Sequence, residues 1–204
     1  FFAMESFWKR LRYYGLGFGI GLILTFGIFN TRGCSWMPSN RVKDAMNKRI
    51  WMINEQSIQN FYSQHHLNDK KFYRLIQDAE ISFTKSIRSG RHKVYALIFT
   101  DGNHKKAHCF ARMTDESFVV EFIPGIRTLK AFKKMKRPTN GARIVHVPTL
   151  KHLIYSDENP ALKEHLRSIG IQNDIQLQKQ LLSGSFDYQK SRLNELPRPI
   201  HVFE

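Results

Sequence analysis

The chain has 204 residues and carries 32 Lys and Arg against 17 Asp and Glu, which gives a formal net charge of +15 and a pI of about 10.0. This length suits one domain or two small ones, and the excess positive charge favours an anionic partner, either nucleic acid or anionic lipid. The two cysteines match no CxxC spacing, and the chain contains no P-loop, no GxSxG motif and no GxGxxG in the required context. The familiar motifs of nucleotide binding, serine hydrolysis and Cys-based metal or redox sites are therefore excluded.

The first predicted element is an apolar helix near the N-terminus. Tyr13 to Phe29 is a run of seventeen uncharged residues, about the shortest that crosses a bilayer core as a helix, and aromatic residues flank it as in an interfacial belt. A cleaved signal peptide is the alternative, because basic residues precede the run, but no small-x-small cleavage site follows it. Residues 1–30 are therefore predicted to be a tail and a retained transmembrane helix.

Four glycines alternate along this run and form two small-xxx-small pairs, Gly15 with Gly19 and Gly17 with Gly21. Such pairs let helix backbones approach closely, so the glycines predict packing against a helix of another membrane subunit or of a second copy. The basic residues on the two flanks lean slightly towards a C-terminal body on the cytoplasmic side.

Residues 31–53 are predicted to be a basic connector, and a degenerate repeat follows it. The stretch 54–69 aligns with 158–174, then 78–86 with 183–191, and the strand from Val94 with the strand from Ile200. The offset drifts slowly from 104 to 106 residues, as single-residue insertions in loops would cause. The chain is therefore predicted to contain a tandem repeat.

Each copy has the pattern of two helices followed by strands. Residues 54–126 predict two helices and a four-stranded antiparallel meander, with a hairpin signal at 101–103. A basic linker at 127–147 leads to the second copy, 148–204, which stops before its last two strands and must pair with the first copy, with a partner, or not at all. The predicted fold class is α+β, with one N-terminal transmembrane helix and two degenerate helix–helix–antiparallel-meander repeats, the second truncated.

The linker between the copies is the leading candidate for contact with an anionic partner. Residues 127–143 carry seven positive charges and no acid, which can neutralise several phosphates, although Phe132 is the only aromatic residue among them. A solvated linker held near anionic lipid headgroups is the alternative. A second basic group lies at or near the hairpin ends of the first copy. Together the predicted binding residues are Lys130, Lys133, Lys134, Lys136, Arg137, Arg88, Arg91, Lys105 and Lys106.

The stretch DGNHKKAH supports a second hypothesis, an RNase-like reaction. His104 and His108 would serve as acid and base, and Lys105 or Arg112 would stabilise the phosphate. A histidine just after a hairpin turn is also an ordinary polar turn residue, so the favoured prediction names no catalytic residue. No closed set of four metal ligands is present, and neither a metal nor a cofactor is predicted.

The block CSWMPSNRVKDAM, together with the Gly-rich run before it and LIQDAEISFTKS and VYALIF after it, resembles a bacterial family of small single-span membrane proteins. The resemblance covers roughly residues 5–123, and Cys34 to Val42 is its most specific part. It implies a membrane anchor and a domain of unknown function, similar in outline to the helix-plus-meander fold of RelE and colicin-type RNase toxins. It brings no functional residues with it.

These observations predict a non-catalytic accessory subunit of a larger complex in the bacterial inner membrane. Its basic cytoplasmic body would contact an anionic partner, such as the ribosome or RNA at the protein-export translocon, an acidic protein surface or lipid headgroups. The alternatives are a membrane-tethered RNase-like enzyme and a periplasmic-side subunit of an envelope complex.

Overall fold

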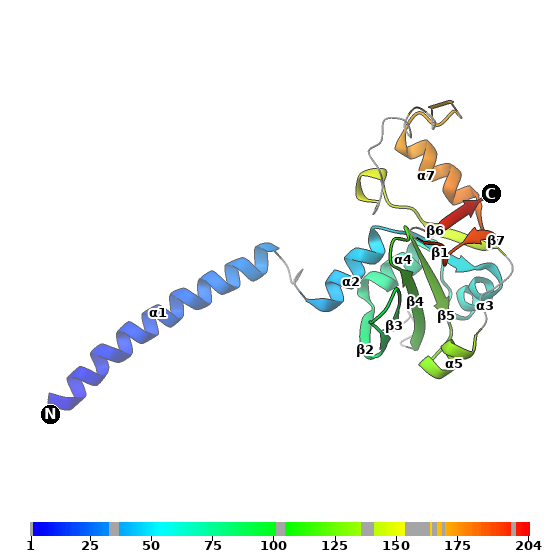
Figure 1. Ribbon diagram of the computed structural model, residues 1–204. Coiled ribbons are helices and arrows are strands. Elements are labelled where there is room, and N and C mark those ends of the chain that lie inside the picture. The colour runs from blue at the N-terminus through cyan, green and yellow to red at the C-terminus, as the bar shows by residue number, and fades with distance from the viewer. Residues whose placement is uncertain are drawn as a thin grey trace. The chain divides into compact units, whose positions relative to one another are not determined.

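One long helix makes up most of the N-terminal unit, residues 1–41. Helix α1 spans Phe2–Arg32 in the computed structural model (Figure 1). The structure describes residues 2–32, 37–100, 105–135, 141–153, 164, 167–168, 170–196 and 199–204.

The prediction of a transmembrane span is wrong. Among the described residues, no helix combines the length and the apolar character that crossing a bilayer requires. Helix α1 has enough residues, but five glycines and two tyrosines dilute its apolar run, and Arg10 and Arg12 lie just before that run. The predicted localisation in the bacterial inner membrane depended on this span and is corrected with it.

The four glycines predicted to pack in a membrane, Gly15, Gly17, Gly19 and Gly21, lie on α1 with open space around them. A Cβ atom added at any of them would meet no described atom within 4 Å outside the helix itself. No close helix contact is therefore present at these positions within the described chain.

An eight-stranded mixed sheet organises the second unit, Val42–Glu204. The strand order is β2-β3-β4-β5-β1-β6-β7-β8, in which β1 and β5 run parallel and every other neighbouring pair is antiparallel (Figure 1). The strands are β1 Ile50–Asn54, β2 Glu80–Ile87, β3 His92–Thr100, β4 Lys106–Thr114, β5 Val119–Pro124, β6 Ala142–His146, β7 Ser185–Arg192 and β8 Ile200–Phe203.

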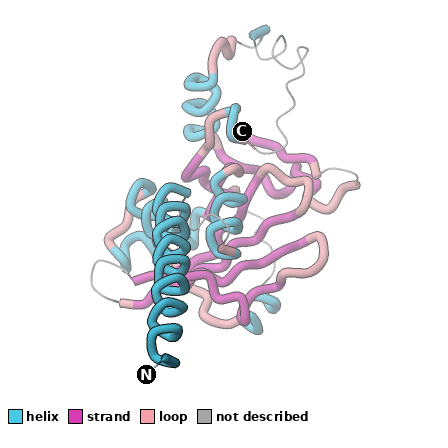
Figure 2. Tube along the Cα trace, turned by 90° about the vertical axis from the view of Figure 1, so that its left-hand side faces the viewer, coloured by secondary structure: helices cyan, strands magenta, loops and turns pink. Residues whose placement is uncertain are grey.

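Helices lie on both faces of this sheet (Figure 2). Helices α3 and α4 pack on one face, while α5 and α7 contribute to the clusters on the other. The helices that the structure describes in this unit are α2 Pro38–Asn47, which begins just before it, α3 Glu55–His65, α4 Asp69–Asp78, α5 Leu129–Lys134 and α7 Asp174–Ser183, with a 3-10 turn at Leu150–His152.

The central strand β1 is buried on both faces, because it lies between layers of helices. Trp51 and Ile53 face α3 and α4, and Ile50 and Met52 face the opposite cluster, as the alternation of a strand requires. Trp51 is fully buried and donates a hydrogen bond from Nε1 to the carbonyl of Met46 at 2.8 Å.

Aromatic rings surround Trp51 on the helical face. Its ring centroid lies 5.0 Å from that of Tyr73, 4.8 Å from Phe122, 5.1 Å from His146 and 6.4 Å from Phe72. These rings come from α4, β5 and β6, so the cluster joins three elements to the central strand. Burial lowers the pKa of His146 to about 4, so this ring is neutral at pH 7.

The hairpin of β7 and β8 reaches across the other face of the sheet to β5. The Tyr188 hydroxyl donates to Glu121 Oε1 at 2.7 Å, and Glu121 Oε2 lies 3.1 Å from an Arg112 guanidinium nitrogen. This ion pair is almost dry, since the side chains of Arg112 and Glu121 are 12% and 4% exposed. Nearby, His201 lies 2.9 Å from the hydroxyl of Ser117.

Two hairpins share an irregularity at matching positions. In β2, the Ser86 hydroxyl donates to the Ser82 carbonyl and accepts from the amide of Ala96 at 3.0 Å. In β7, Ser191 makes the same two bonds, to the carbonyl of Asp187 and from the amide of Val202 at 2.9 Å. The pairing register shifts at each site. Ser191 lies 105 residues after Ser86, and the carbonyl and amide partners of the two serines are likewise 105 and 106 residues apart.

The predicted α+β class is confirmed, but the predicted arrangement is not the one observed. Strands β2 to β5 form an antiparallel meander, and the later hairpin joins the same sheet through β6 and β1. The segments 54–126, 127–147 and 148–204 thus belong to one compact unit. Residues 50–53, predicted as the end of the connector, belong to the central strand β1.

Candidate anion-binding surface

Helix α5 presents three lysines because its apolar side is fixed to the sheet. The Thr128 hydroxyl caps the helix by accepting from the amide of Ala131 at 3.2 Å. Phe132 is buried, with its ring centroid 5.1 Å from that of Phe110 on β4. The three lysines of the helix, Lys130, Lys133 and Lys134, are exposed.

The start of β4 lies at the same end of the sheet as α5. Lys106 pairs with the last residue of β3, and the amide of Gly125, just after β5, donates to the carbonyl of His108 at 2.9 Å. Gly125 has a φ of +82°, a conformation that glycine adopts without steric cost, and it turns the chain from β5 towards α5. Lys106 and Arg127 are both exposed.

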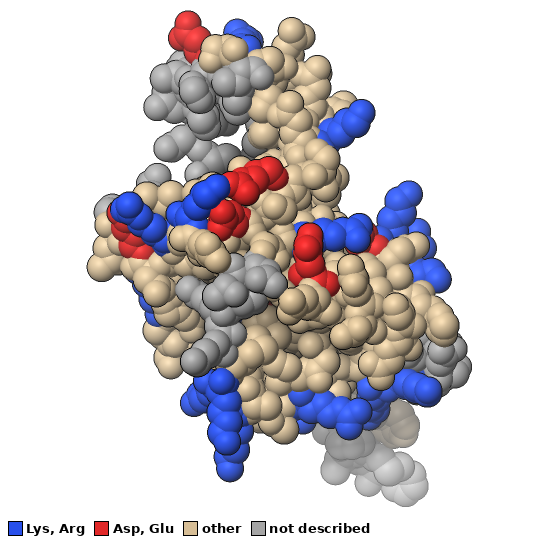
Figure 3. Space-filling model, turned by 90° about the vertical axis from the view of Figure 1, so that its right-hand side faces the viewer, with Lys and Arg blue, Asp and Glu red and all other residues tan. Residues whose placement is uncertain are grey.

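These cations form a surface that no described acid neutralises. We call Lys106, Arg127, Lys130, Lys133 and Lys134 the basic end. None of the five forms an ion pair with a described carboxylate. Figure 3 shows Lys and Arg along the lower edge of this face, the end at which Figure 1 places α5, and Asp and Glu higher up.

His108 reports the positive field at the basic end. Its side chain is half-buried on β4, and its pKa is lowered first by burial and then by the positive charges of Lys85, Arg127 and Lys106. Its ring therefore titrates below its ordinary range, and near pH 7 it is mainly neutral.

Replacing Arg127 by glutamine is expected to raise the pKa of His108, because one of the charges that oppose its protonation is removed. An NMR titration of the His108 ring protons measures this shift. The control is Arg167→Gln, a change of the same charge at another exposed arginine. Equal pKa values of His108 in the wild type and in Arg127→Gln would contradict the proximity of the two groups.

The second basic group does not form a single surface. Lys105 and Lys106 lie at one end of the β3–β4 pair, and Arg88 and Arg91 lie at or beyond the other end. Eight residue steps separate the ends, or about 26 Å along a strand. The guanidinium of Arg91 donates to the carbonyls of Asn194 and Glu195, so it ties the β2–β3 turn to the loop before β8.

Two of the predicted linker cations, Lys136 and Arg137, lie outside the described residues. Arg88 lies with its guanidinium carbon 5.9 Å from the centre of the Phe83 ring. The basic end therefore contains Lys130, Lys133, Lys134 and Lys106 from the predicted set. It adds Arg127, whose charge had been counted in the linker but not named as a binding residue.

The structure gives little support to the RNase-like site. His104 lies outside the described residues, so its distance from His108 is not defined. Arg112 pairs with Glu121 and lies 4.9 Å above the Phe132 ring, so it is engaged in the interior. Among the described residues, no three His, Cys, Asp or Glu side chains are placed to hold a metal ion.

The Arg112–Glu121–Tyr188 network was not predicted, although a signal for it exists. Arg112 and Glu121 are isolated charges within strongly apolar strands, and they are directly opposite each other in the β4–β5 register. Opposite charges at one cross-strand position indicate a buried pair.

Comparison of the chain with family models, with curated proteins and with solved structures finds no match in any of the three. The resemblance to a bacterial membrane-protein family therefore stays a prediction.

Proposed function

We propose that this chain is a non-catalytic RNA-binding protein whose basic end is the interface. The observation that carries the proposal is the group of five exposed cations around α5 and the start of β4, which no described carboxylate neutralises. Several closely spaced cations release counterions when they meet a phosphate backbone, and this release provides sequence-independent affinity.

The character of the surface favours contacts with phosphates over contacts with bases. Phe132, the aromatic residue of α5, is 6% exposed and packs inward, so it offers no stacking platform. Lysine binds phosphate as a point charge without the planar specificity of a bidentate arginine. Binding is therefore expected to tolerate sequence changes in the RNA and to weaken steeply as salt increases.

The test compares two variants that change the net charge equally. Lys130→Glu/Lys133→Glu/Lys134→Glu removes three cations of the basic end, and Lys151→Glu/Arg167→Glu/Lys179→Glu removes three exposed cations elsewhere. Affinity for a labelled single-stranded RNA is measured by fluorescence anisotropy across a salt series. The plot of log K against log salt has a negative slope, and the first variant is expected to make that slope shallower by about 2. Each lost phosphate contact contributes about 0.7 for a single strand.

The control variant is expected to keep a slope close to that of the wild type. Equal losses in the two variants would mean that net charge alone drives the binding, and they would contradict an interface at the basic end. An acidic peptide that competes with RNA for the same three lysines would instead favour an acidic protein surface as the partner.

A further inference from the structure

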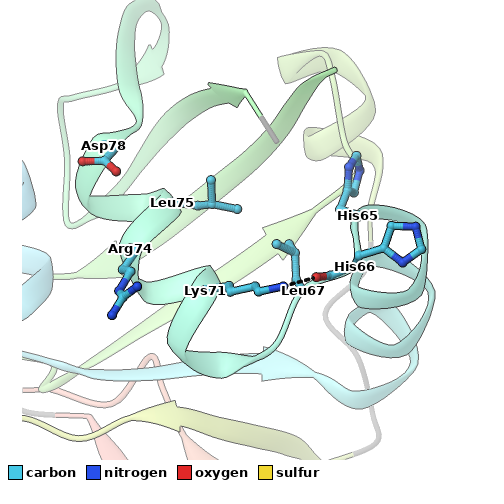
Figure 4. A pocket seen from close by; sticks show the side chains of 7 residues that line it. All are labelled: His65, His66, Leu67, Lys71, Arg74, Leu75 and Asp78. Atoms are coloured by element: carbon cyan, nitrogen blue, oxygen red, sulfur yellow. Dashed lines mark hydrogen bonds between the residues drawn. The ribbon is translucent and has the colours of Figure 1, made fainter. Parts of the chain in front are cut away.

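A groove opens between the end of α3 and the exposed side of α4. Its volume is about 380 Å³, within the range of small-molecule sites. Figure 4 shows Leu75 between Asp78 on one side and the two histidines on the other. The groove is lined by His65, His66, Leu67, Lys71, Arg74, Leu75 and Asp78.

The lining combines an apolar floor with positive charge. Leu67 and Leu75 are half-buried and pack against the core cluster behind them. Lys71 donates from Nζ to the carbonyl of His66 at 3.3 Å, which leaves two of its three protons for a ligand. Arg74 is exposed and forms no hydrogen bond or ion pair with the described residues. The groove thus offers two cationic side chains, Lys71 and Arg74, and one carboxylate, Asp78, beside an apolar surface.

The start of α7 in the second copy corresponds to the start of α4, and it carries Gln176 where α4 carries Lys71. Asn68 caps α4 by accepting from the amide of Lys71, and Asn173 caps α7 by accepting from the amide of Gln176, both at 2.9 Å. Gln176 then bonds back to the amide of Gln172 at 2.7 Å and completes the helix start. Lysine has no acceptor to do this, and the helix dipole disfavours a cation in the first turn.

The turn that precedes the cap shows the same contrast. His66 has a φ of +50°, and the corresponding Gly170 has a φ of +86°. Glycine adopts this left-handed conformation freely, whereas a residue with a side chain adopts it at some cost. In the first copy, therefore, two positions bordering the groove carry side chains that local stability does not favour.

We propose that this groove binds the phosphate monoester of a small molecule, of the size and chemistry of a mononucleotide. Lys71 and Arg74 hold the phosphate, and Leu67 and Leu75 contact the flat apolar part of the ligand. His66 closes the groove at the end of α3. The site lies on the helical face of the sheet, opposite the face that α5 covers, and it does not depend on the proposed RNA surface.

The test uses isothermal titration calorimetry of the full chain with AMP as the probe, alongside adenosine. AMP is expected to bind saturably and adenosine to bind at least tenfold more weakly, because a charge-assisted hydrogen bond contributes about a factor of ten or more. Lys71→Gln and Arg74→Gln are each expected to weaken AMP binding about tenfold. Lys70→Gln, at an exposed neighbour that does not line the groove, is the matched control and is expected to leave the affinity unchanged.

His66→Gly provides a variant that keeps the fold, since glycine suits the backbone there. It is expected to weaken AMP binding while the melting temperature stays the same or rises. Several results would overturn the proposal: no saturable AMP binding up to about 10 mM, ten times a Kd of 1 mM; equal binding of adenosine and AMP; equal losses in Lys70→Gln and Lys71→Gln; or unchanged AMP affinity in His66→Gly.

Discussion

Replacing Glu121 by leucine is expected to lower the free energy of unfolding by about 3–5 kcal/mol, as removal of one partner from a buried ion pair does. The Arg112 guanidinium would be left in the interior without its carboxylate, and the Tyr188 hydroxyl would lose its acceptor. This loss is a large share of the roughly 5–15 kcal/mol that stabilises a typical domain. Urea unfolding followed by circular dichroism measures it.

The matched control is the double variant Arg112→Leu/Glu121→Leu. Because two leucines leave no buried charge, the double variant is expected to be more stable than Glu121→Leu alone. Tyr188→Phe is expected to cost about 1.5–3 kcal/mol, the contribution of a hydrogen bond to a charged group. If Glu121→Leu were as stable as the wild type, β5 and β7 would not be joined through this carboxylate.

Replacing Trp51 by alanine is expected to cost about 3–5 kcal/mol, the range for truncating a large buried aromatic residue. Trp51 is fully buried against neighbouring aromatic rings, and its removal would leave a cavity between α4, β5 and β6. It would also leave the Met46 carbonyl without the indole donor. Thermal and urea unfolding of the purified chain measure the change.

Leu196→Ala is the control for this truncation. Leu196 is also a large apolar residue but is 74% exposed, so its loss is expected to change the stability by less than about 0.5 kcal/mol. A cost below about 1 kcal/mol for Trp51→Ala would contradict the burial of its ring in the centre of the sheet.

Local elements were predictable where neighbouring residues determine them. Asn68 is an N-cap, a position that asparagine favours, and the alternation in residues 80–87 marks a strand. The central strand was not predictable in this way. Residues 50–54 form a short apolar run, and its neighbours in the sheet come from residues 119–124 and 142–146. No local pattern reports such distant pairing.

In the candidate site, too, only the features that neighbouring residues determine were predictable. The lysines of α5 were predicted from the charge of the linker alone, since a cluster of cations within one turn of helix needs no tertiary information. The separation of Arg91 from Lys106 depends on the β3–β4 register, and the contacts of Arg91 come from residues 194 and 195. The transmembrane prediction rested on the length of an uncharged run, and no described helix combines the length and the apolar character that crossing a bilayer requires.

The position of β1 has a consequence for how the chain folds. This strand precedes the others in sequence, yet it occupies the middle of the sheet, and its partners are separated from it by about 70 and 90 residues. Such long-range pairings close large loops and slow folding. On the ribosome, the meander of β2 to β5 is complete before β6 has been synthesised. The centre of the sheet is therefore finished after one of its wings, because β1 can pair with β5 at that stage but its other edge stays unpaired until β6 is made.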